Sequence, residues 1–204
     1  MAFRRRAPKA PPDPIAAEVD PATVPPEYRP PVVDALNARS QFGVLVGAVP
    51  DGPMRSRLEE LARRVDAGVL AVWQTVGQAV RLEGVVAALD PDRVANAMKQ
   101  AKRDEASGAL DPATLEAVAA RFAATQRLLN SLDDLRERLP VLEARLGTAV
   151  ARAAELTLTS SASSSAAGLD ALTGELDTLV LELDALRAGV DAVGGLGSGG
   201  LGSG

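Results

Sequence analysis

Few residues in this chain have side chains suited to catalysis. The sequence contains no histidine and no cysteine, which removes imidazole bases, thiolate nucleophiles, disulfides and the usual zinc and haem ligands. Carboxylates, lysines and hydroxyls remain, but no glycine-rich phosphate loop of the GxGxxG or GKT kind accompanies them. Without histidine, the commonest general acid and base is also missing. We therefore expect a protein that is not an enzyme and that binds no cofactor and no metal.

The most regularly spaced carboxylates lie near the C-terminal end of the chain. Asp170, Asp177, Asp184 and Asp191 recur every seven residues, so on a helix neighbouring carboxylates would lie about 10 Å apart. That separation is too large for two of them to share one metal ion. We interpret this row as the solvated outer face of a helix, with a basic protein partner as the alternative.

A basic cluster lies at the opposite end of the chain. The FRRR start supplies Arg4, Arg5 and Arg6, and Lys9 follows. Charge of this kind can contact anionic lipid or nucleic acid. No aromatic residues are interleaved with these cations and no recognition motif follows them, so contact with an anionic partner is an alternative and not the main prediction.

Helices must position these residues, because the apolar pattern of the chain is helical. Of the 204 residues, 47% are apolar and only 2% are aromatic, a composition that favours narrow helix seams packed with Leu, Val and Ala. Apolar spacing and the Asp-Pro start signals at Asp90 and Asp111 predict helices over about 54–89, 91–106, 112–159 and 168–193. Pro140 is expected to kink or break the third of these. The chain is therefore predicted to be all-α.

The ends of the chain differ in composition from its centre. Most of the 14 prolines lie in the first 31 residues, so residues 1–40 are predicted to be a disordered proline-rich tail with a basic head. Residues 41–110 hold an apolar patch and the first two helices, and residues 111–193 hold the last two. Residues 194–204 repeat GGLGS and are predicted to be a flexible, linker-like tail.

The last two predicted helices carry the most informative pattern. Both have apolar residues at alternating spacings of three and four, which is typical of coiled-coil seams. If the chain folds back at the serine-rich segment 160–165, these seams meet in an elongated antiparallel hairpin, against which the first long helix packs. A single helix running through the serine-rich segment is the alternative. The predicted seam consists of Leu135, Leu139, Leu142, Leu146, Leu156, Leu169, Leu172, Leu176, Leu179, Leu183, Leu186 and Val190.

Charged positions beside the seam indicate its register. When one helix is reversed against the other, Arg145 lies opposite Glu182 and Arg152 lies opposite Glu175. Exposed ion pairs contribute only about 0.2–1 kcal/mol each. They therefore indicate how the helices are aligned and not how stable the hairpin is.

These features predict a structural or scaffolding coiled-coil protein that acts through helix–helix contacts. The partner is another protein or a second copy, because Val180 and Leu181 are apolar outside the seam. One alternative is a peripheral protein that assembles on bilayers. Its general outline resembles phage-shock-type helical proteins, although the proline-rich start departs from the amphipathic N-terminal helix that this resemblance implies. An adaptor that binds nucleic acid through Arg4 to Lys9 and the basic helix 93–103 is the least supported alternative.

The sequence also suggests where the protein acts. No uncharged apolar run approaches the roughly 20 residues that a membrane span needs, and the N-terminal arginines are not followed by a signal-peptide core. We expect a cytoplasmic protein, with association with a membrane surface as the alternative.

Overall fold

The structure is a computed structural model that describes residues 13–158 and 162–198. Every regular element in this part of the chain is helical, which confirms the all-α prediction. Four long helices dominate, and two short turns of 3-10 helix, η1 and η2, precede the first of them. The elements in chain order are α1 (Pro14–Glu18), η1 (Pro21–Thr23), η2 (Pro26–Tyr28), α2 (Arg29–Ala48), α3 (Pro53–Leu89), α4 (Pro91–Ala106), α5 (Pro112–Leu158) and α6 (Ala162–Ser198).

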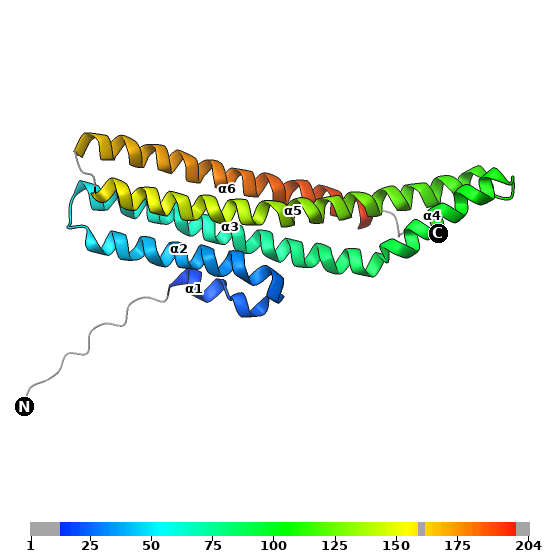
Figure 1. Cartoon of the computed structure of the whole chain (residues 1–204), viewed down its shortest axis with the longest axis horizontal. Helices are drawn as coiled ribbons and strands as arrows, with labels where there is room; N and C mark the ends of the chain where they lie inside the picture. The colour runs from blue at the N-terminus through cyan, green and yellow to red at the C-terminus, as the bar shows by residue number, and fades with distance from the viewer. Residues whose placement is uncertain (1–12, 159–161, 199–204) are drawn as a thin grey trace, which may run out of the picture.

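Helices α2, α3, α5 and α6 lie side by side as an elongated bundle (Figure 1). The central pair, α3 and α5, is antiparallel, and each of its members packs against both α2 and α6. Helices α2 and α6 lie on opposite sides of this pair. Because α6 runs antiparallel to α5 and parallel to α3, its inner face is covered by two helices and its outer face by none of the described elements.

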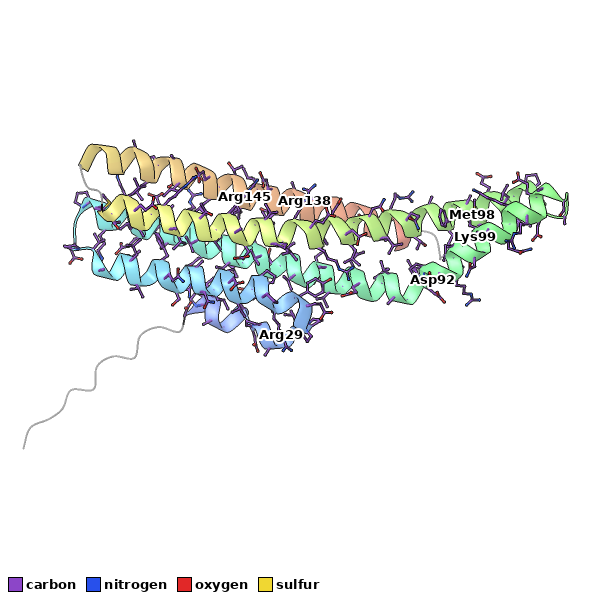
Figure 2. The ribbon with its side chains drawn as sticks, in the orientation of Figure 1. Arg29, Asp92, Met98, Lys99, Arg138 and Arg145 are labelled. Atoms are coloured by element: carbon purple, nitrogen blue, oxygen red, sulfur yellow. The ribbon has the colours of Figure 1, made fainter. Side chains whose placement is uncertain are left out.

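A two-helix arm projects beyond one end of the bundle. It consists of α4 and residues 112–127 of α5, which pack against each other (Figures 1 and 2). Asp90 joins α3 to α4 in a left-handed conformation with φ of 53°, and its carboxylate accepts a hydrogen bond from the Arg93 amide. Gly108, with φ of 72°, ends α4, and Asp111 caps the start of α5 through the Thr114 amide. Short caps therefore fix where the arm begins and turns back.

The middle of α3 is the centre of the bundle. Its residues between Gly68 and Ala79 are mostly buried, because α2, α5 and α6 all contact this helix. A Cβ placed on Gly68 would lie 3.3 Å from Cδ1 of Leu146 in α5 and 4.0 Å from Cδ2 of Leu179 in α6. The missing side chain at Gly68 therefore lets three helices approach one another closely.

The prediction of a disordered tail is wrong for residues 13–40. The short helix α1 and the turns η1 and η2 lie against the bundle and bury apolar side chains, which are Ile15, Val19, Val24 and Tyr28. The prolines start helices here and do not prevent them, because proline in the first turn gives up an amide that has no partner in a helix. Helix α2 then buries Val32, Ala35, Ala38 and Phe42 at helical spacing. Residues 1–12, with the basic head, lie outside the described residues.

Two further expectations differ from the structure. Helix α5 is continuous through Pro140, so the predicted break is absent. Helix α6 begins inside the serine-rich segment and extends over residues 194–198, which were predicted to be part of a structureless tail. Serine and alanine do not stop a helix in the way that proline does, and no proline follows Pro140. Residues 159–161 and 199–204 lie outside the described part of the chain.

Candidate protein-interaction surface

Helices α5 and α6 bring most of the predicted seam residues into the bundle core. The buried ones are Leu135, Leu139, Leu142, Leu146, Leu169, Leu172, Leu176, Leu179 and Leu183. Leu156 is partly buried, and the side chains of Leu186 and Val190 lie outside the described part. Leu142, Leu179 and Leu183 share one buried cluster with Ala71 of α3. Helix α3, the first long helix, which the sequence placed against the hairpin, thus contributes to this core.

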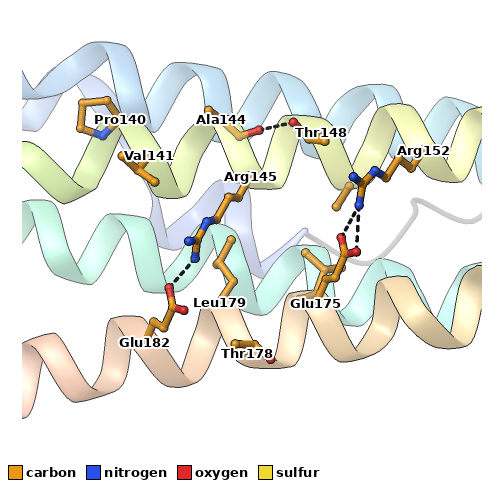
Figure 3. A pocket seen from close by; sticks show the side chains of 12 residues that line it. Pro140, Val141, Ala144, Arg145, Thr148, Arg152, Glu175, Thr178, Leu179 and Glu182 are labelled. Carbon is orange, nitrogen blue, oxygen red and sulfur yellow. Dashed lines mark hydrogen bonds and ion pairs between the residues drawn. The ribbon is translucent and has the colours of Figure 1, made fainter.

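Two ion pairs connect α5 to α6 at the edge of this core. Arg145 Nη1 donates to Glu182 Oε2 at 2.5 Å, and Arg152 Nη1 donates to both carboxylate oxygens of Glu175 at 2.8 and 2.9 Å (Figure 3). All four side chains are about half exposed. The pairs therefore align the two helices at the surface. Because the side chains are half exposed, their guanidinium and carboxylate groups can still form hydrogen bonds with a partner molecule.

A groove runs between α5 and α6 beneath these ion pairs, with a volume of about 740 Å³. Buried Ala149, Leu176 and Leu179 contribute to its lining, and Figure 3 shows its side chains in close view. The rim contains exposed, uncharged side chains, which are Pro140, Val141, Ala144, Thr148 and Thr178. The groove thus has a partly apolar floor, which lies beneath the arginines of α5 and the glutamates of α6 that pair above it.

The uncharged rim is part of a larger surface, which we call the outer face. On α5 it contains Pro140, Val141, Ala144, Thr148 and Ala151, and on α6 it contains Ala167, Ala171, Gly174, Thr178, Leu181, Ala185 and Ala188. All of these residues are exposed, and their spacing of three and four places them on one side of each helix. Val141 is 51% exposed and Leu181 is 68% exposed. The outer face therefore consists of two rows of uncharged residues, with the half-exposed pairs Arg145–Glu182 and Arg152–Glu175 between them.

The sequence interpretation recognised only part of this surface. The sequence interpretation includes Leu181, which is apolar outside the seam, but not the small residues around it. Their positions could have identified them. Helix positions opposite a seam are ordinarily charged or polar, and on α6 they are alanine, glycine, threonine and leucine.

The row of aspartates on α6 lies on the flank that faces α3. Arg64 of α3 forms an ion pair with Asp177, and Arg57 of α3 lies 3.9 Å from Asp170. The interpretation of this row as a solvated outer face is wrong for Asp177, because α6 packs against α3 as well as α5. Asp191 lies outside the part whose side chains are described. On one flank of α6 Asp177 pairs with α3, and on the other flank Glu175 and Glu182 pair with α5. The residues of α6 that belong to the outer face lie between these two flanks and are uncharged.

On the other side of the bundle, ion pairs attach the N-terminal segment. The Arg39 guanidinium donates to Asp13 at 2.6 and 2.8 Å and to Asp66 of α3 at 2.6 Å. The hydrogen bond from Arg39 is the largest effect on the pKa of Asp13 and lowers it below its ordinary value. Tyr28 accepts a hydrogen bond from Arg136 of α5 at 3.3 Å, and burial raises the pKa of its phenol. Arg39 thus connects the start of the N-terminal segment to α3, and Arg136 connects the end of the segment to α5.

The remaining predicted contacts are less informative. Arg4, Arg5, Arg6 and Lys9 lie outside the described residues. On the arm, Lys99 and Met98 are marked in Figure 2, and the cations of α4 share that helix with Asp92, Asp104 and Glu105. The basic helix is thus not a continuous positive surface.

Neither a metal site nor a membrane span is found in the part of the chain that the structure covers. No group of three potential metal ligands occurs among the described residues. In that same part, no helix combines the length and the apolar character needed to cross a membrane. No protein-family model, curated protein or solved structure matches this chain.

Proposed function

We propose that this protein is a non-enzymatic structural scaffold that binds protein helices through the outer face of an α5/α6 coiled-coil hairpin. The observation that carries the proposal is the outer face itself, two exposed rows of uncharged residues on adjacent helices, in which Val141 is 51% and Leu181 is 68% exposed. Exposed apolar side chains with polar residues around them are typical of binding sites for protein partners.

The shape of the outer face suits a helical partner. Alanine, glycine and threonine dominate it, so a second helix can approach to the short interaxial distance of about 8 Å that small contact residues allow. The groove lies between α5 and α6 beneath Arg145 and Arg152, and buried Leu176 and Leu179 form part of its lining. In helix-in-groove recognition an amphipathic helix lays its apolar face into such a groove.

Site-specific photo-crosslinking in the native cell tests this function. A photoreactive amino acid in place of Thr148, on the rim of the groove, should give covalent adducts with protein. The matched control places the same amino acid at Asn96, which is exposed on α4 of the arm, and should give few or none. Equal adducts at both positions, or none at Thr148, would contradict the proposal.

A second candidate function is contact with a bilayer surface. The C-terminal half of α2, from Ser40 onward, carries no charge, and Val44 within it is 73% exposed. Apolar side chains on such a helix can insert at a lipid interface. Co-sedimentation with anionic liposomes tests this candidate: the chain should sediment with them, and Val44→Glu should reduce the bound fraction several-fold. Binding that is insensitive to Val44→Glu would exclude α2 as the contact.

A further inference from the structure

We propose that the partner of the outer face is a second copy of this chain, packed face to face about a two-fold axis parallel to the helices. In this dimer α5 of each chain lies against α6 of the other. The inference rests on the proposed function, because it assigns the partner of the same surface.

Charge complementarity selects the second copy and the direction of the axis. Each outer face has an arginine row on α5, Arg145 and Arg152, and a glutamate row on α6, Glu175 and Glu182. A two-fold axis parallel to the helices sets the arginine row of each chain over the glutamate row of the other. A two-fold axis across the helices and parallel to the face would set arginine over arginine. Like charges in an interface are costly, so only the first arrangement is complementary.

The resulting helix arrangement is also favourable. Since α5 and α6 are antiparallel within one chain, α5 of one chain is antiparallel to α6 of the other. The four helices at the interface then alternate in direction around a common core, as in up-and-down four-helix bundles. Small residues such as Ala144, Thr148 and Gly174 allow the two pairs to approach closely.

The size of the outer face sets the expected affinity. At 1.5 Å per residue its α6 part, residues 167–188, is about 32 Å long and its α5 part, residues 140–151, about 17 Å, so a helix width of about 10 Å gives about 500 Å² per chain. The total of about 1,000 Å² lies in the range of weak, transient protein interfaces. Val141 and Leu181 are the large apolar side chains that the dimer would remove from water. We therefore expect reversible dimerisation in the micromolar range.

Symmetry fixes which residues meet. A two-fold axis parallel to the helices adds no translation along them, so each α5 residue faces the α6 residue that lies at its own level in the hairpin. The ion pairs Arg145–Glu182 and Arg152–Glu175 show which levels coincide. Thr148 of one chain therefore faces Thr178 of the other, and both side chains are exposed in the single chain.

Sedimentation velocity of the full chain over about 1–200 µM tests the self-association. The native chain should shift from monomer to dimer, and Val141→Glu combined with Leu181→Glu should weaken the dimer at least tenfold. Both positions are exposed, so circular dichroism should show unchanged helix. Val44→Glu, an exposed valine on α2, is the matched control and should leave the mass distribution unchanged. Equal weakening by both sets of variants would overturn the proposal.

Cysteine pairing tests the geometry, since the chain has no cysteine of its own. Chains with Thr148→Cys and chains with Thr178→Cys are prepared separately, mixed and oxidised. The mixture should form disulfide-linked dimers several times faster than either variant alone, because each cysteine faces the other type across the interface. Faster pairing of one variant with itself would overturn the parallel axis.

The outcomes also separate this inference from the proposed function. A chain that stays monomeric at about 200 µM but gives photo-crosslinks at Thr148 to a different protein overturns the dimer and leaves the scaffold function in place. A monomeric chain without photo-crosslinks at Thr148 overturns both. A dimer whose photo-crosslinks at Thr148 lead to the same chain supports both.

Discussion

At the scale of single residues, the glycines inside α3 show how much depends on one missing methyl group. A Cβ on Gly84 would meet nothing within 4 Å, and one on Gly77 would meet only the tip of Arg81. A Cβ on Gly68 would meet Leu146 and Leu179 from two other helices. The three glycines look equivalent in the sequence, and only Gly68 lies where helices cross.

Leucine substitutions distinguish these positions. Gly68→Leu should lower the free energy of unfolding by about 1–3 kcal/mol, because the new side chain overpacks a closed contact between three helices. Gly84→Leu should raise it by about 0.5 kcal/mol, because leucine favours the helix and meets open space. Urea denaturation followed by circular dichroism measures both values. If the two variants lose equal stability, the close approach at Gly68 is not what constrains that position.

The ion pairs of Arg39 predict a pH effect. The hydrogen bond from Arg39 lowers the pKa of Asp13 in the folded chain below its unfolded value of 3.8. The resulting stability is therefore fully present well above pH 3.8 and is lost as the pH falls through the lowered pKa. Asp13→Asn should reduce stability at pH 7, and the difference from the native chain should shrink at about pH 3. Urea denaturation at the two pH values measures it, and a difference that is constant with pH would contradict this assignment.

At the scale of elements, the sequence indicated helices well where apolar spacing and caps agreed. The expected start signals at Asp90 and Asp111 coincide with observed caps of α4 and α5. Composition was a poorer guide to the helices than the spacing of apolar residues. Residues 29–40 of α2 fall in the predicted proline-rich tail, although Val32, Ala35 and Ala38 show helical spacing directly after the last proline of that region. Proline content alone does not distinguish a disordered tail from a series of helix starts.

The docking of the N-terminal segment has a measurable consequence. Ile15 on α1 is 4% exposed and packs in the main core, so Ile15→Ala should lower the free energy of unfolding by about 2–4 kcal/mol. Val33→Ala on α2 is the control, because Val33 is 40% exposed and its truncation should cost less than about 0.5 kcal/mol. Equal values for the two variants would mean that the segment does not pack on the bundle in solution.

The candidate surface was predictable only in part for a similar reason. Heptad spacing identified which residues of α5 and α6 face inward, because burial imposes a period on apolar residues. It did not show that α3 would cover the aspartate flank of α6, since that depends on how a distant helix packs. Leu181 and Thr178 can be recognised as exposed only when it is known that α3 and α5 cover the two flanks of α6 and leave the side between them open.

At the scale of the whole molecule, the chain divides into a tightly packed bundle and a thinner arm. In the bundle, α3 is covered by three helices, whereas in the arm α4 packs mainly against α5. Within α4 only Val94 and Ala101 are buried. The arm has therefore little core of its own, and its stability comes from one helix pair and from the caps at its ends.

Hydrogen exchange should report this difference. Amides of α4 and of residues 112–127 should exchange through local opening, at least about tenfold faster than amides of α3 between Gly68 and Ala79, because few apolar contacts must break to open the arm. Mass spectrometry of peptic fragments measures the rates, with α2 as an internal reference inside the bundle. Arm amides as protected as those of α3 would show that arm and bundle unfold as one unit.

Helix α5 belongs to both parts, since it is continuous from Pro112 to Leu158. At 1.5 Å per residue, the distance along it from the arm's turn to Arg145 is about 50 Å. A ligand that tilts or rotates the tip of the arm therefore has a stiff mechanical link to the far side of the molecule. A rotation of α5 about its own axis would turn the arginine row of the groove together with the arm, because both lie on the same helix.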